Sequence, residues 1–174
     1  MAWKRLIFLL FFLTSIVEAK EFKLKKIISL DEPWGSSFIS DTELLITEKP
    51  GKIKLFNITN NNISEINHNL KILNYGQGGL LDIIFYNNSV WVSYAELRGN
   101  GKTSTSIARG IFNKNKINFN NIFQASPPID SPYHFGSRLA IKNDYLFASL
   151  GERGKGMIAQ DATKHPGSII RIHL

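Results

Sequence analysis

The sequence predicts an all-β protein built from short antiparallel strands, on the strength of its apolar runs and the residues between them. No helical periodicity stands out after residue 20; short apolar runs recur instead, several with apolar and polar residues in alternation. The gaps hold turn formers such as Pro50-Gly51, Asn87-Asn88 and Asn143-Asp144. Such runs and gaps are typical of strands joined by tight turns. The expected strands cover residues 38–39, 44–46, 53–56, 80–85, 90–92, 145–150 and 168–174.

Three stretches also resemble one another, at residues 35–48, 79–96 and 136–152. Each begins with glycine, runs through an apolar strand, turns at Asp or Asn, enters a second apolar strand and ends on glutamate. A self-similar four-stranded unit of about 40 to 50 residues is the pattern of a β-propeller blade. A single β-sandwich is the alternative, but nothing in a sandwich requires its hairpins to repeat. The repeat therefore favours a propeller.

The composition excludes several classes of site and partner. The 174 residues include 43% hydrophobic residues and no cysteine. This suits one globular core and excludes disulfides, thiolate metal sites and cysteine nucleophiles. The net charge of +7 comes from 21 Lys and Arg against 14 Asp and Glu. These cations are scattered singly or in pairs and form no patch, so we expect no nucleic-acid partner.

Residues 1–19 have the features of an export signal. Two cations precede an almost wholly apolar run of 12 residues at 6–17, which is too short for a membrane-spanning helix. The run ends in a small-x-small pattern at Ala19. We predict cleavage after Ala19, a mature chain of residues 20–174, a periplasmic location and no stable membrane insertion. An uncleaved membrane anchor is the alternative.

The segment Gly76-Gln77-Gly78-Gly79 is a candidate binding element. Three glycines around one glutamine cost backbone entropy, which indicates that the chain needs unusual conformations there. Such a turn brings the Gln77 amide close to a ligand. The alternative is a tight turn between blades with Gln77 in solvent.

His134 is a candidate general base, since it begins a strand after the Pro-rich segment 126–132. Histidine titrates near neutral pH, and loops at one end of a rigid scaffold carry function; a purely structural histidine is the alternative. Glu152 closes the third repeat as Glu48 and Glu96 close the other two. Glu152 could be a ligand or a turn-closing carboxylate, and its recurrence in every repeat favours the second, architectural role.

Four sequence blocks, in order, resemble the glucose/sorbosone dehydrogenase family. Residues 33–51 carry PWG and LLITEKPG, and residues 76–96 carry GQGGLLD and VSYAE. Residues 134–154 carry HFGSRL and LGERG, and residues 159–172 carry AQD and PGSIIRI. More narrowly, the chain is similar to the soluble aldose sugar dehydrogenases that use pyrroloquinoline quinone. The blocks span nearly the whole of the predicted mature chain.

This resemblance implies a six-bladed β-propeller that is exported to the periplasm and oxidises the C1 hydroxyl of an aldose to a lactone. The hydride passes to pyrroloquinoline quinone (PQQ), which calcium polarises. By motif, His134 would be the base that removes the hydroxyl proton, and Gln77 would bind the sugar in the same pocket. Arg138 lies in the motif too and is interpreted as framework.

One departure from the family concerns the sugar. In the glucose-specific branch an aspartate precedes the catalytic histidine, whereas Tyr133 precedes His134 here. This is closer to the broad-specificity branch, so glucose selectivity is not expected. The sequence identifies neither the sugar nor the soluble electron acceptor.

A second departure concerns length. About 45 residues per blade predict that the chain covers roughly the first three blades plus the start of the next. The family's cationic contacts to the quinone carboxylates and its calcium ligands are expected beyond Leu174, so residues 20–174 form the N-terminal part of the domain. Alone, they are expected to be inactive. A non-catalytic propeller binding module and a calcium-dependent lactonase-like hydrolase are the alternative functions.

Overall fold

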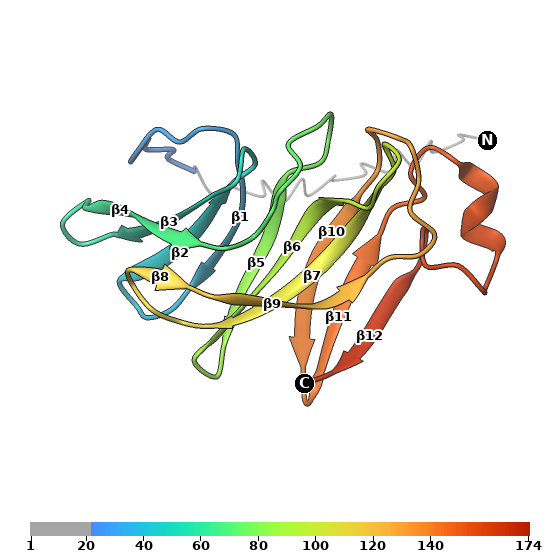
Figure 1. Cartoon of the computed structure of the whole chain (residues 1–174). Coiled ribbons are helices and arrows are strands. Elements are labelled where there is room, and N and C mark those ends of the chain that lie inside the picture. Colours follow the sequence, from blue (N-terminus) through green and yellow to red (C-terminus); the bar gives the residue numbers. More distant parts are fainter. Residues whose placement is uncertain (1–21) are drawn as a thin grey trace, which may run out of the picture.

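Three antiparallel sheets stand side by side in the computed structural model, which describes residues 22–174 (Figure 1). The leader predicted at residues 1–19 lies outside the described residues. The first sheet contains β1 (Pro33–Phe38), β2 (Glu43–Glu48), β3 (Lys52–Asn57) and β4 (Ile63–His68). The second contains β5 (Leu80–Tyr86), β6 (Ser89–Leu97), β7 (Thr103–Ile111) and β9 (Phe119–Gln124). The third contains β10 (Gly136–Lys142), β11 (Tyr145–Leu150) and β12 (Ile169–His173).

Two short elements lie outside this plan. Strand β8 (Lys116–Ile117), from the connection between β7 and β9, pairs in parallel with β4 and so adds to the first sheet. The 3₁₀ helix η1 (Gly156–Gln160) lies in the connection from β11 to β12. Within residues 22–174, no helix has both the length and the apolar character needed to cross a bilayer.

The three sequence repeats coincide with the first hairpin of each sheet, β1–β2, β5–β6 and β10–β11. The first strand of every hairpin also carries a register shift near its start, between Pro33 and Ser36, Leu80 and Ile83, and Gly136 and Leu139. A bulge at the same place in three strands is a repeated structural device. The all-β prediction and the blade repeat are therefore confirmed.

The last expected strand belongs to the third sheet. Residues 168–174 contain β12, which pairs antiparallel with β11 and is the third strand of that sheet. Two connections, at 125–135 and 151–168, are longer than the tight turns between the other strands. They lengthen the chain between strands without adding a further sheet within residues 22–174.

Alternating side chains of β6 join the sheets face to face. Val90, Val92 and Tyr94 are buried in a cluster with side chains of the first sheet. Trp91 points the other way and packs with Leu139 and other side chains of the third sheet. This period of two is what a strand between two blades requires. Each fully buried aliphatic side chain contributes about 1.5–3 kcal/mol.

A buried aspartate connects the second and third sheets at their bulges. Asp82 is 2% exposed, and its Oδ2 accepts a hydrogen bond from the Leu139 amide at 2.7 Å. Its Oδ1 is paired with Arg138 Nη1 at 3.0 Å. A Cβ on Gly35 would lie 2.7 Å from the same Oδ1, so the first sheet also closes on this carboxylate.

We expect Asp82→Asn to destabilise the protein by about 1–3 kcal/mol, because one oxygen acceptor becomes an NH₂ that faces a donor. Urea unfolding measures the loss. Asp144→Asn, on an exposed hairpin turn, is the matched control and should change the free energy of unfolding by less than about 0.5 kcal/mol. Equal stability of the two variants would contradict the role given to Asp82.

Candidate functional site

The two residues predicted from sequence lie at the same end of the sheets. Gln77 precedes β5 and His134 precedes β10. Both strands are the first of their sheet and run in the same direction, from top to bottom in Figure 1. The loops that lead into β5 and β10 therefore lie next to each other, and they carry Gln77 and His134.

Gln77 lies in a tight turn closed by two hydrogen bonds between Tyr75 and Gly78, at 3.3 and 2.9 Å. Gly76 has φ of +58°, and a Cβ there would lie 2.5 Å from a side-chain carbon of Pro132. The turn therefore requires glycine for its conformation and for its contact with the loop before β10. The backbone N–H of Gln77 donates to the Pro132 carbonyl at 2.8 Å, and this hydrogen bond joins the two loops.

The Gln77 side chain contacts the second predicted residue. Its Oε1 accepts a hydrogen bond from the backbone N–H of His134 at 2.8 Å. A backbone N–H can only donate, so this contact fixes which way the amide faces. The NH₂ group of Gln77 is then left as a donor on an exposed turn. The structure thus brings Gln77 and His134 together.

His134 has an unusual backbone and a half-exposed ring. Its φ is +47°, and its side chain is 52% exposed. Nδ1 lies in hydrogen-bond contact with Oε1 of Glu152, which also accepts from the Gly154 amide at 3.0 Å. An ionised carboxylate only accepts, so Nδ1 carries the proton. In the neutral ring, Nε2 is then the basic nitrogen.

Glu152 has a contact that the sequence interpretation did not predict, because its carboxylate touches the ring of the candidate base. It was grouped with Glu48 and Glu96, but the three carboxylates have different contacts. Glu48 is 4% exposed and accepts from the Asp31 amide at 2.8 Å, and Glu96 accepts from Ser106 Oγ at 2.6 Å. One signal in the sequence could have indicated this contact: a histidine, His134, precedes the first strand of the third repeat.

Arg138 has its side-chain contact with the framework. Its side chain is 70% exposed, and Nη1 is paired with the buried Asp82. The pair ties the bulge of β10 to the bulge of β5. This contact agrees with the framework interpretation of Arg138 and shows no link to the His134 ring.

The contact between His134 and Glu152 has a pH dependence with a definite sign. The hydrogen bond from His134 lowers the pKa of Glu152 from its ordinary value of 4.5. A lowered carboxyl pKa stabilises the fold above the ordinary value, and this contribution is lost as the pH falls through the lowered pKa. We expect Glu152→Gln to be less stable than wild type at pH 7, with the difference shrinking as the pH falls below 4.5, the ordinary pKa of the carboxyl. Urea unfolding across this pH range measures it, and a difference that stays constant would contradict the assignment.

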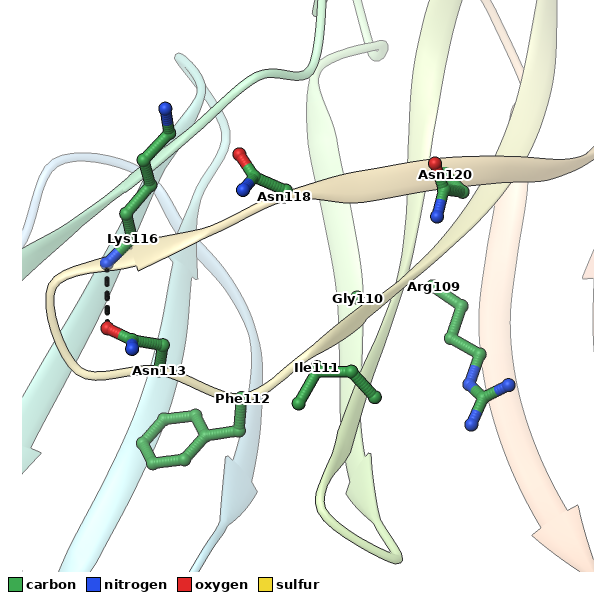
Figure 2. A pocket seen from close by; sticks show the side chains of 8 residues that line it. All are labelled: Arg109, Gly110, Ile111, Phe112, Asn113, Lys116, Asn118 and Asn120. Atoms are coloured by element: carbon green, nitrogen blue, oxygen red, sulfur yellow. Dashed lines mark hydrogen bonds between the residues drawn. The ribbon is translucent and has the colours of Figure 1, made fainter.

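A hollow of about 460 Å³ lies at the other end of the second sheet. It surrounds the end of β7, where Ile111 pairs with Ser89 of the β5–β6 hairpin. Figure 2 shows the two cations in its lining, Arg109 and Lys116, extending to different sides. It contains neither Gln77 nor His134 and is not part of the candidate site.

Carboxylates and histidines do not gather further around the site. Among residues 22–174, no group of three or more His, Asp or Glu side chains is arranged to hold a metal ion. The chemistry that the described residues offer is therefore that of one histidine–carboxylate pair and one amide.

Comparison with known proteins identifies one family. The family described as glucose / sorbosone dehydrogenase matches residues 30–174. An aldose sugar dehydrogenase of Escherichia coli is 30% identical over 153 residues, which cover 82% of this chain and 41% of that protein. The chain thus spans about half the length, 41% and 45%, of the curated relatives that it matches.

The fold of this chain is similar to those of solved sugar dehydrogenases. The soluble aldose sugar dehydrogenase of Escherichia coli in its apo form has a TM-score of 0.79 and 30% identity, over 83% of this chain and 44% of that one. The PQQ-bound aldose sugar dehydrogenase of Streptomyces coelicolor has a TM-score of 0.74 and 22% identity, over 83% of this chain and 45% of that one. The latter likeness establishes the fold alone.

Proposed function

This chain belongs to the glucose/sorbosone dehydrogenase family, and from that premise we propose that the full-length protein oxidises an aldose at C1 to the lactone. The observation that carries the proposal is the exposed His134 imidazole, held through Nδ1 by Glu152 and through its backbone by Gln77. A histidine oriented by a carboxylate is the arrangement of a general base.

His134 acts as the proton acceptor. Its Nε2 removes the proton of the C1 hydroxyl, and Glu152 stabilises the imidazolium that forms. Gln77 orients the sugar, because its NH₂ donates to a sugar oxygen while its Oε1 holds the His134 amide. PQQ, when bound, supplies the acceptor for the hydride that leaves C1.

The described residues fit one part of a quinone site. They offer a base and an amide donor next to the reacting oxygen. Two of their arginines are not free to hold carboxylates, since Arg138 is paired with Asp82 and Arg153 donates to backbone carbonyls. We assign the quinone carboxylate contacts and the calcium ligands to residues outside this chain.

Export and substrate range complete the proposal. We propose that residues 1–19 are a signal peptide and that residues 20–174 belong to a periplasmic propeller domain. Tyr133 lies beside His134, with ring centroids 6.2 Å apart, and is 55% exposed. A neutral aromatic ring at this position supports a broad range of aldoses. The electron acceptor is a soluble molecule of unassigned identity.

Reconstitution of the full-length protein with PQQ and calcium tests the proposal. We expect reduction of an artificial dye by several aldoses, and none when the quinone is omitted. A panel of lactones, assayed for hydrolysis with calcium alone, separates the hydrolase alternative. Sugar binding without dye reduction by any aldose would leave a binding module and contradict the proposal.

A further inference from the structure

Arg153 is a buried cation next to the candidate site that the chemistry above does not use. Arg153 is 3% exposed, and within residues 22–174 no carboxylate is paired with it. Its N–H groups donate to neutral oxygens instead. These are the Tyr133 carbonyl at 2.8 Å, the Thr103 carbonyl at 3.1 Å, Thr103 Oγ1 at 2.7 Å and the Ser131 carbonyl.

These contacts converge on the loop that carries His134. Ser131 and Tyr133 precede His134, whereas Thr103 begins β7 of the second sheet. One guanidinium therefore anchors the loop before β10 to the neighbouring sheet. Arg153 also follows Glu152 directly, so the same residue fixes the segment that supplies the carboxylate to the His134 ring.

A second contact extends to the Gln77 turn. The Arg153 guanidinium carbon lies 3.6 Å from the centroid of the Phe135 ring. The Phe135 ring in turn lies against Gly78, where a Cβ would be 2.7 Å from the ring. Arg153 is thus in contact, directly or through one ring, with every segment that holds a predicted site residue.

We propose that Arg153 is the positioning residue of this site, which holds the His134 loop in the geometry needed for proton removal. The inference rests on the proposed function. His134 occupies a left-handed conformation at φ of +47°, which is strained for a residue with a Cβ. Surrounding contacts must offset that strain, and the carbonyls on which Arg153 acts belong to the residues immediately before it.

The charge and shape of arginine both matter here. Burial lowers the pKa of Arg153 to about 10, so the guanidinium still carries its charge at pH 7. A lysine would keep the charge but present one compact ammonium. Unlike the planar, forked guanidinium, this ammonium cannot donate to carbonyls on opposite sides at once. Arg153→Lys therefore separates geometry from charge.

Arg153→Lys in the full-length protein tests the proposal. We expect kcat to fall about 10- to 100-fold with KM nearly unchanged, because a misplaced base slows chemistry more than binding. We expect hydrogen exchange of the His134 amide to quicken at least tenfold while amides in the middle of β6 keep their protection. Arg109→Lys is the matched control, since Arg109 also lies over an aromatic ring, Trp91, and donates to Ser89 Oγ, but at the far end of the second sheet.

The double variant with His134→Gln distinguishes a positioning role from a general structural one. If Arg153 acts through His134, Arg153→Lys lowers kcat no further once His134 is replaced. Additive losses, unchanged exchange of the His134 amide, or an equal kcat loss in Arg109→Lys would overturn the proposal. The exchange result does not depend on activity, so it decides the point even where no aldose is oxidised and the proposed function fails.

Discussion

If the proposed function holds, we expect replacing His134 by glutamine to lower kcat by about 10²- to 10⁴-fold, the usual contribution of a general base. Glutamine approximates the size of the imidazole but cannot take up a proton. The fold should survive, because the side chain is 52% exposed on a loop. Quinone affinity should change little, since the carboxylate contacts are assigned elsewhere. Steady-state dye reduction, thermal unfolding and quinone titration on one preparation measure all three.

His165→Gln is the matched control for this experiment. The Nδ1 of His165 accepts a hydrogen bond from the Ser126 amide at 3.0 Å, and its ring packs against Phe123. This is a packing histidine, so its loss should lower stability and leave kcat nearly normal. If His134→Gln behaves in the same way, with kcat within about twofold of wild type and far below the general-base range, His134 is not the base.

The repeated hairpins could be predicted because their signals are local. Apolar alternation and turn residues specify each pair of strands without reference to the rest of the chain. Asn87 and Asn88, for example, occupy left-handed conformations with φ of 46° and 56° in the β5–β6 turn, which asparagine tolerates better than most residues. The same reasoning predicted the strand at 168–174, which contains β12, but its pairing with β11 depends on the length and path of the connection at 151–168.

The candidate site was only partly predictable because its contacts are not local. Gln77 and His134 could each be singled out from the residues around them, but 57 residues separate them along the chain. Nothing in the sequence indicates that the Gln77 amide holds the His134 backbone. The contact of Glu152 was unpredictable for a related reason: its place in the repeat matches those of Glu48 and Glu96, and its partner His134 lies 18 residues away along the chain.

Gly151→Ala should be the most damaging substitution that adds a single carbon atom. A Cβ on Gly151 would lie 2.0 Å from the carbonyl oxygen of His134 and 2.5 Å from its carbonyl carbon. Neither atom is the end of a flexible side chain, so the backbone of one loop or the other must move. We expect a loss of about 3 kcal/mol in the free energy of unfolding, the upper end of the usual cost of overpacking.

The same substitution should also lower kcat, because the atom displaced belongs to His134 itself. Gly101→Ala is the matched control: Gly101 has φ of +72° but nothing within 4 Å of an added Cβ. That variant suffers backbone strain without a clash, so it should lose about 1 kcal/mol and keep its kcat. Urea unfolding and dye reduction on both variants separate the two effects. A Gly151→Ala protein as stable and active as Gly101→Ala would mean that the close approach of Gly151 to the His134 carbonyl is not needed. The loop could then hold its base in more than one position.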